Sequence, residues 1–251
     1  MKFDRSLSMP AEWSAGLRQG VLLGAAVLVL TLPPAGRATS RHSTVAQAAA
    51  AHAFDDARVA DFGEHIVSPD ARHVANWVAR SRDNQRLPFV ILDKRDARVF
   101  VFNADGMLID SSPVLLGAAA GDESVVGIGQ RPIAQVLPEE RTTPAGRFIS
   151  QPGRNASGED VVWVDYDAAV SMHRVRPVDP KERRLERLAS NDPAQRRISY
   201  GCVNVPVAFF DGVILPAMGA RRGVVYVLPE KKALREVFAA ADPAGFAAGR
   251  I

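Results

Sequence analysis

The sequence has a single cysteine, Cys202, among 251 residues. A chain with one thiol cannot close an internal disulfide, so this thiol is buried and inert, pairs between molecules, or reacts. The spacings Cys-x-x-Cys and His-x-x-x-His do not occur, which removes the common zinc sites. Gly-x-Ser-x-Gly and Ser-x-x-Lys are missing too, so serine chemistry has no support. We therefore expect no metal and no cofactor.

Histidine is scarce as well. The chain has five of them: His42, His52, His65, His73 and His173. If Cys202 draws an imidazole from its own domain, His173 has to supply it, and the pair forms a candidate thiol–imidazole dyad. A lone histidine at the end of a strand is also commonly a satisfied core residue, and this alternative stays open.

Long apolar runs are lacking except near the N-terminus. Basic residues precede twelve mostly apolar residues, 21–32, which Pro33 and Pro34 close. A twelve-residue helix is about 18 Å long, well short of a hydrocarbon core of roughly 30 Å. The pattern predicts a signal peptide over residues 1–38, with an uncleaved signal anchor as the alternative. We expect export to the periplasm or cell envelope, with membrane contact only through this segment.

The charge balance is basic, with a net charge of +3 and a pI of about 9.3. Basicity could indicate nucleic acid, but export argues against it. An anionic polymer of the cell envelope is the partner that fits both observations.

Pattern changes divide the remaining chain into three parts. Residues 39–86 are predicted to be an Ala-rich linker and a short helical segment, whose helix starts at Ser68-Pro69 and runs to about Arg82. Residues 87–230 have short apolar runs typical of strands and are predicted to be the catalytic domain; residues 231–251 would be a C-terminal helix and tail. The expected strands are 89–92, 99–103, 107–110, 113–116, 161–166 and 224–228, with a helix over 230–241. The fold class is mixed α/β and β-rich, a sandwich or barrel with a few peripheral helices.

The cysteine lies in the segment Ser199-Tyr200-Gly201-Cys202-Val203-Asn204, and Pro206 follows within an apolar run. Glycine allows a substrate carbonyl to approach the backbone closely. A helix N-terminus would stabilise a thiolate beside it. We therefore expect Cys202 at a turn that enters a helix.

These residues, in the order His173 and then the cysteine segment, resemble the L,D-transpeptidase catalytic-domain family. The segment Thr143-Pro144-Ala145-Gly146-Arg147-Phe148 is similar to that family's Thr-Pro-x-Gly-x-Phe motif, and the resemblance covers roughly residues 87–229. It implies an L,D-transpeptidase-like β-rich fold, with Cys202 as the nucleophile and His173 as the general base. Two features depart from the family: Tyr200 replaces the histidine before Gly-Cys, and the spacer between His173 and Ser199 is longer than usual.

Further roles are predicted around this dyad. Backbone donors of Gly201 and Cys202 would hold the oxyanion, and Tyr200 would set the polarity beside it. Ser199 would orient the loop, and Asn204 would cap the following helix. In the basic spacer, Arg183, Arg184 and Arg187 would form a lid that meets substrate carboxylates, the alternative being a solvated surface helix.

The resemblance implies an exported cysteine acyltransferase that acts on peptidoglycan stem peptides. A thioester on Cys202, resolved by the amine of a neighbouring stem, would give a 3-3 cross-link. The same thioester resolved by water gives an L,D-carboxypeptidase, and resolved by a protein amine it attaches that protein to the wall. A noncatalytic peptidoglycan-binding module is the alternative from another class, and the sequence does not separate these four.

Overall fold

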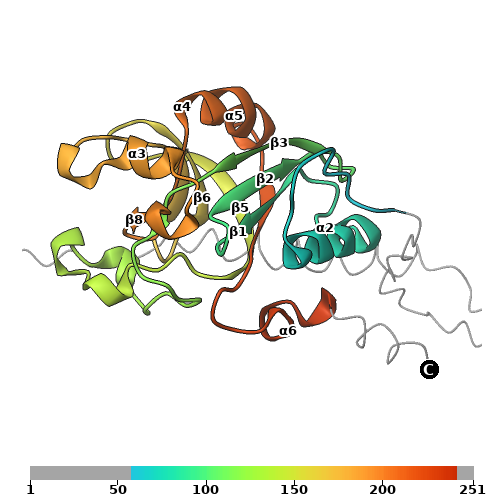
Figure 1. Cartoon of the computed structure of the whole chain (residues 1–251), viewed down its shortest axis with the longest axis horizontal. Coiled ribbons are helices and arrows are strands. Elements are labelled where there is room, and N and C mark those ends of the chain that lie inside the picture. Colours follow the sequence, from blue (N-terminus) through green and yellow to red (C-terminus); the bar gives the residue numbers. More distant parts are fainter. Residues whose placement is uncertain (1–57, 242–251) are drawn as a thin grey trace, which may run out of the picture. The chain divides into compact units, whose positions relative to one another are not determined.

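The computed structural model describes residues 58–241. Its main feature is an eight-stranded sheet with the order β3-β2-β1-β10-β5-β6-β7-β9, accompanied by a two-stranded sheet of β4 and β8 (Figure 1). The predicted signal peptide 1–38, the start of the predicted linker and the end of the tail lie outside the described residues. Among residues 58–241, no helix has the length and apolar character needed to cross a membrane.

The element bounds are as follows. The strands are β1 Phe89–Asp93, β2 Arg98–Phe102, β3 Leu108–Pro113, β4 Leu116–Gly117, β5 Gly146–Arg154, β6 Asp160–Asp165, β7 Val170–Arg174, β8 Arg197–Ser199, β9 Val203–Val205 and β10 Gly223–Val227. The α-helices are α2 Pro69–Ser81, α3 Arg184–Ala189, α4 Val207–Phe209, α5 Leu215–Met218 and α6 Leu234–Val237. A π-helical segment, Phe210–Ile214, joins α4 to α5.

Helix α2 begins where the sequence predicts. The Ser68 hydroxyl accepts a hydrogen bond from the Ala71 N–H at 3.1 Å, and Pro69 occupies the first helical position. The helix ends at Arg82, which adopts the left-handed conformation with φ 54°. The expected helix from Ser68-Pro69 to about Arg82 is confirmed.

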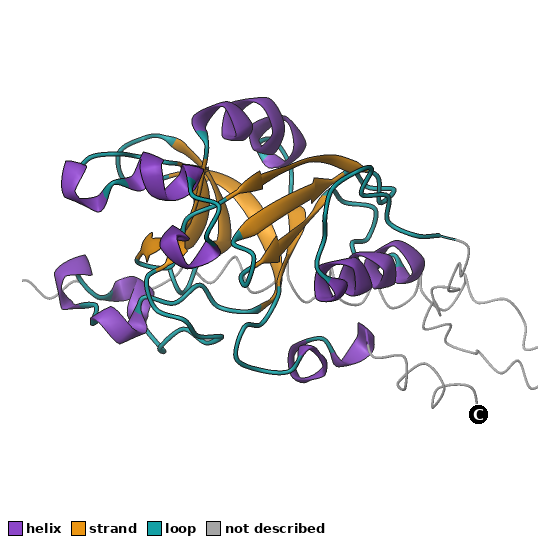
Figure 2. Ribbon diagram, viewed as in Figure 1, coloured by secondary structure: helices purple, strands orange, loops and turns teal. Residues whose placement is uncertain are grey.

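The middle of the sheet is covered on both faces. One face packs against α4 and α5, and the opposite face of β1, β2 and β10 packs against α2 (Figures 1 and 2). Every residue of β1 and β10 is buried as a result, which explains why these strands are apolar without alternation. The expected β-rich mixed fold with a few peripheral helices is confirmed.

Two local expectations are wrong, and four strands, β5, β7, β8 and β9, were not predicted. Residues 113–116 do not form one strand, because β3 ends at Pro113 and β4 starts at Leu116. The helix expected over 230–241 is restricted to α6 and a 3-10 turn at 239–241. Strand β5 had no predicted counterpart, since Gly146, Pro152 and Gly153 interrupt its apolar pattern.

The α2-facing core depends on a group of aromatic rings. Phe89 is fully buried, its ring stacks on that of Phe102 at 4.6 Å, and it meets the Tyr226 ring edge-on at 6.1 Å. Truncation at Phe89 removes these contacts and leaves a cavity between α2 and the sheet.

We predict that Phe89→Ala lowers the free energy of unfolding by about 3–5 kcal/mol. Urea denaturation followed by circular dichroism measures it. The matched control is Val126→Ala at a side chain that is 99% exposed, where a change below about 0.5 kcal/mol is expected. Equal midpoints for Phe89→Ala and the control would contradict the proposed core.

Candidate active site

Strand pairing brings the two predicted chemical groups together. Strands β7 and β9 are parallel neighbours, with Met172 opposite Val203 and His173 opposite Asn204. Because side chains alternate between faces along a strand, Ser171 and His173 share one face of the sheet with Cys202 and Asn204. Met172 and Val203 point to the other face, into the core beneath α4 and α5. The core therefore fixes which face carries the thiol and the imidazole.

Cys202 and His173 lie close enough to alter each other's titration. Burial is the largest influence on the thiol and raises the pKa of Cys202, but the hydrogen bond and charge of His173 outweigh it and lower that pKa overall. Burial likewise lowers the pKa of His173, and the hydrogen bond and charge of Cys202 outweigh it, so that the pKa of His173 is raised. Both shifts favour a thiolate–imidazolium pair.

Ser171 is a further partner of the sulfur. Its hydroxyl lies 3.7 Å from Cys202 Sγ, and its backbone N–H also contributes to the lowered pKa of the thiol. In the protonated state the thiol donates to the Ala169 carbonyl at 3.5 Å. The Ser171 donors favour the anionic form of the sulfur, whereas the Ala169 carbonyl is an acceptor that favours the protonated thiol; Cys202 remains partly exposed.

A hydrogen bond at Nδ1 orients the His173 imidazole. His173 Nδ1 donates to the Arg174 carbonyl at 2.7 Å, which leaves Nε2 for the active-site side. Nε2 lies 3.5 Å from the side-chain nitrogen of Asn204. This tautomer suits a group that takes a proton from the thiol and later returns it to a leaving amine.

Asn204 does not cap a helix, contrary to the prediction. It is fully buried within β9, and Pro206 precedes α4 in its place. Its amide nitrogen donates to the Cys202 carbonyl at 3.3 Å, and its amide oxygen accepts from Arg184 at 2.5 Å. Asn204 therefore connects the backbone of Cys202, the imidazole of His173 and the guanidinium of Arg184.

The cysteine does not precede a helix either. The residue after Cys202 begins strand β9, and α4 starts only at Val207. A helix N-terminus thus makes no contribution at the sulfur, and the lowered pKa of the thiol has its source in His173 and Ser171.

The loop that carries the thiol requires glycine at position 201. Gly201 has φ +130°, and a Cβ there would lie 2.7 Å from the Thr142 carbonyl oxygen. The carbonyl of Gly201 accepts from the Thr143 hydroxyl at 2.8 Å, and that hydroxyl accepts from the Gly117 N–H at 2.9 Å. The Thr143 side chain therefore holds the backbone of the cysteine loop at Gly201.

One predicted oxyanion donor is already engaged. The Gly201 N–H donates to Ser199 Oγ at 3.1 Å, and Ser199 Oγ donates to the Cys202 carbonyl at 2.6 Å. Ser199 thus connects Gly201 and Cys202 within the loop, and its role in orienting the loop stays a prediction. Within residues 58–241, the backbone N–H groups of Tyr200 and Cys202 donate to no backbone carbonyl. These two N–H groups, and not that of Gly201, are available to an oxyanion.

Tyr200, which stands where the related motif has histidine, is partnered by an arginine. The Arg141 guanidinium lies over the Tyr200 ring, with its carbon 4.1 Å from the ring centroid. A positive charge therefore remains beside the cysteine loop although an imidazole is missing from this position.

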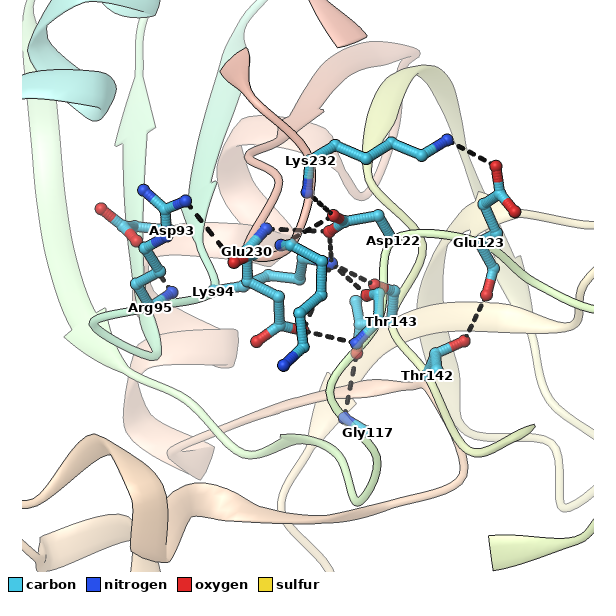
Figure 3. A network of polar contacts seen from close by, with 12 residues as sticks. Asp93, Lys94, Arg95, Gly117, Asp122, Glu123, Thr142, Thr143, Glu230 and Lys232 are labelled. Carbon is cyan, nitrogen blue, oxygen red and sulfur yellow. Dashed lines mark hydrogen bonds and ion pairs between the residues drawn. The ribbon is translucent and has the colours of Figure 1, made fainter. Parts of the chain in front are cut away.

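A buried ion network surrounds Lys94 and includes the Thr143 backbone (Figure 3). Lys94 is fully buried, and its ammonium donates to Asp122 at 2.7 Å, to the Gly121 carbonyl at 2.5 Å and to the Thr143 carbonyl at 2.9 Å. Asp122 also accepts from the backbone N–H groups of residues 230, 231 and 232. Burial works to raise the pKa of Asp122, but these donors outweigh it and lower that pKa. All three ammonium protons are satisfied, so Lys94 fixes the Thr143 backbone.

The dyad opens into a pocket of about 340 Å³. His173, Ser199, Tyr200, Cys202, Asn204 and Arg184 contribute to its wall. Ile133 approaches from the loop of short helices at 128–140 and Val178 from the spacer before α3, and Figure 1 shows these two segments at the same end of the sheet. The thiol is therefore accessible to a substrate held between two loops.

The three predicted lid arginines separate into two groups. Arg184 lines the pocket of Cys202, whereas Arg183 and Arg187 line a different hollow. Arg183 pairs with Glu186 on the exposed surface, and Arg187 donates to the Glu182 carbonyl at 2.9 Å. Among these arginines, only Arg184 is placed to meet a substrate at the thiol.

Two supporting residues were missed by the sequence reasoning. Ser171 could have been found, because it lies two positions before His173 in a run whose polar residues alternate. Lys94 gives no such signal, since a lysine at the end of a strand is ordinarily exposed. No cluster of three or more histidine, cysteine or acidic side chains suited to a metal occurs within residues 58–241.

Comparison with known proteins finds no matching family model and no matching curated protein. Solved structures give remote likenesses. An L,D-transpeptidase (residues 123–326) from Xylanimonas cellulosilytica aligns at 15% identity and TM-score 0.36, covering 56% of this chain and 60% of that one. The L,D-transpeptidase from Mycobacterium smegmatis aligns at 16% and 0.33, covering 56% and 58%. The helical cell shape determining protein Pgp2 from Campylobacter jejuni aligns at 16% and 0.37, covering 58% and 49%. The chain thus spans 49% to 60% of these structures, and at such scores the likenesses decide neither family nor activity.

We predict that the Cys202 thiol is alkylated by iodoacetamide with a midpoint pH below that of an ordinary thiol, about 8.5. Because His173 lowers the thiol pKa, His173→Ala should raise the midpoint, and Ser171→Ala should raise it by less. The single cysteine makes the label specific, and intact mass against pH measures it. His65→Ala, at an exposed side chain, should leave the midpoint unchanged. Identical midpoints in wild type and His173→Ala would rule out the ion pair.

Proposed function

We propose that this protein is an exported cysteine acyltransferase that acts on peptidoglycan stem peptides. The observation that carries the proposal is the accessible Cys202 thiol with its pKa lowered by His173, in a pocket whose lining includes Tyr200 and Cys202. The order of the motifs agrees with the family resemblance, and Thr143 contacts the cysteine loop. This resemblance is the reason for choosing stem peptides as the substrate. The basic charge suits an anionic wall polymer.

The chemistry follows from the placement of these groups. The Cys202 thiolate attacks the amide carbonyl of a donor stem peptide, and the oxyanion that forms accepts hydrogen bonds from the N–H groups of Tyr200 and Cys202. The imidazolium of His173 protonates the departing amine, and a thioester on Cys202 results. Neutral His173 then takes a proton from the attacking amine of a second stem, whose nitrogen replaces sulfur at the carbonyl and closes a 3-3 cross-link.

Geometry supplies more of the rate than acidity does. A thiol pKa lowered by two units raises the thiolate fraction at neutral pH about 25-fold, but the accompanying fall in nucleophilicity removes roughly six- to tenfold of that gain. An oxyanion donor is typically worth about 10²- to 10³-fold. The conformation of the Tyr200–Cys202 backbone therefore matters most, and this conformation is what Gly201, Thr143 and Lys94 maintain.

We predict that a carbapenem acylates the full chain once. Intact mass spectrometry should detect one drug adduct on wild type and none on Cys202→Ala. The adduct should form at least about 100-fold more slowly on His173→Ala, because proton transfer by a positioned side chain contributes about 10²- to 10⁴-fold. Analysis of muropeptides after incubation with sacculi then identifies the acceptor: 3-3 dimers indicate a stem amine, and tripeptides indicate water. A chain that takes up no drug and changes no muropeptide would be a binding module.

We also predict that Arg184 and Arg183 differ in their contribution to turnover of stem peptides. Arg184→Gln removes the guanidinium that lines the thiol pocket and contacts Asn204, so kcat/KM for stem peptides should fall by about tenfold or more, the size expected when one charged hydrogen bond is lost. Arg183→Gln, at an exposed position outside that pocket, is the matched control and should retain the wild-type value. Equal losses at both positions would indicate a general effect of charge on the polymer and contradict a specific role of Arg184.

A further inference from the structure

A second hollow lies on the same face of the sheet as the thiol. Strand register defines its position: Gln151 of β5 is opposite Trp163 of β6, and Trp163 is opposite Ser171 of β7. Ser171 in turn contacts Cys202 Sγ. Gln151, Trp163 and Ser171 therefore form one row across β5, β6 and β7, and Cys202, just before β9, lies next to Ser171. With strands about 4.8 Å apart, the backbone of Trp163 lies roughly 10 Å from that of Cys202.

The hollow has a volume of about 440 Å³ and is built around two aromatic rings. The rings of Trp163 and Tyr166 lie 5.2 Å apart at 70° to each other, and Tyr166 is 75% exposed. Gly153 sits under the indole, since a Cβ there would lie 2.7 Å from two of its atoms. The absence of a side chain at position 153 lets the indole lie against the strand.

The hollow has groups that can form hydrogen bonds, but none of them is charged. All of its lining residues are uncharged, in a chain with 24% charged residues. The lining includes three neutral polar groups, the Gln151 amide, the Trp163 indole N–H and the Tyr166 hydroxyl. A ligand that fits offers apolar C–H surface to two rings and hydroxyl or amide groups to three neutral polar groups, with no charge of its own.

We propose that this aromatic hollow, formed by Gln151, Gly153, Trp163 and Tyr166, is a binding site for a neutral saccharide. A pyranose ring has apolar faces that stack on aromatic rings and an equator of hydroxyl and acetamido groups. Stem peptides carry carboxylates and amines, for which the hollow offers no counter-charge. Identifying the saccharide as the glycan strand of peptidoglycan rests on the proposed function; the binding of a neutral sugar does not.

The hollow lies close to the turn that contacts the thiol. The Tyr166 ring stands at the start of the turn between β6 and β7, and the Ala169 carbonyl of the same turn accepts from the Cys202 thiol. A sugar held on Trp163 and Tyr166 would place the peptide attached to it within reach of the thiol. The enzyme would then select stem peptides that are joined to a glycan over free peptides of the same sequence.

The test uses the full chain carrying Cys202→Ala, which binds without forming a thioester, and the neutral tetramer of N-acetylglucosamine. Isothermal titration calorimetry should show saturable binding whose Kd changes less than about twofold between low and high salt, because no charges meet. Trp163→Ala and Tyr166→Ala should each weaken binding about tenfold. Trp163→Phe, which keeps an aromatic ring, should recover part of the loss. Ile66→Ala, at a side chain that is 96% exposed, is the matched control and should bind like the parent.

Two results would overturn the proposal. The first is no saturable binding of the tetramer, or equal affinities in the parent, Trp163→Ala and Tyr166→Ala. The second concerns a free stem tetrapeptide. If the parent binds no sugar, and Trp163→Ala and Tyr166→Ala lose affinity for this tetrapeptide, the hollow is a peptide subsite. Since acylation of wild type by a carbapenem is measured separately, a failure of sugar binding is distinguishable from a failure of the proposed acyl transfer.

Discussion

The parallel pairing of β7 with β9 is the constraint on which the candidate site depends. It sets His173 opposite Asn204 and Ser171 beside Cys202, although 29 positions of chain separate His173 from Cys202. A shift of one residue in this register would turn His173 into the core and Met172 toward solvent. The apolar residues Met172 and Val203, buried on the opposite face, oppose that shift. Packing of the core therefore determines the chemistry on the other face of the sheet.

Around this pairing the protein uses a buried ion network to hold the backbone. Lys94, Asp122 and Glu230 are all removed from water or nearly so, and Arg197 joins them through Glu230. Such a group costs desolvation energy and adds little net stability compared with apolar packing. Its consequence here is geometric, because Lys94 fixes the Thr143 backbone and the Thr143 hydroxyl holds the Gly201 carbonyl. The network thus links the end of β1 to the conformation of the cysteine loop.

The same face extends from the thiol to the aromatic hollow, so the site has two parts with different electrostatics. Near Cys202 the pocket holds charged groups, with Arg184, Glu182 and Arg176 along its wall. Near Trp163 it is neutral. The substrate that we propose, a neutral sugar chain that bears charged peptides, would suit this division. Strand spacing sets the distance between the two parts, and the side chains decide what each part binds.

The sequence by itself determined the single thiol, the one histidine available to it, the need for glycine before the cysteine, and the short apolar runs that become β1, β2 and β10. These features are local, and they follow from residue chemistry and from the two-residue period of strands. Tertiary structure decided that Cys202 enters a strand and not a helix, that Asn204 lies in that strand and binds Arg184, that Ser171 reaches the sulfur, and that the Gly201 N–H is taken by Ser199. Each of these depends on which strands become neighbours and in which register. Pairing energy between distant segments is set by the whole core, and no short window of sequence contains it.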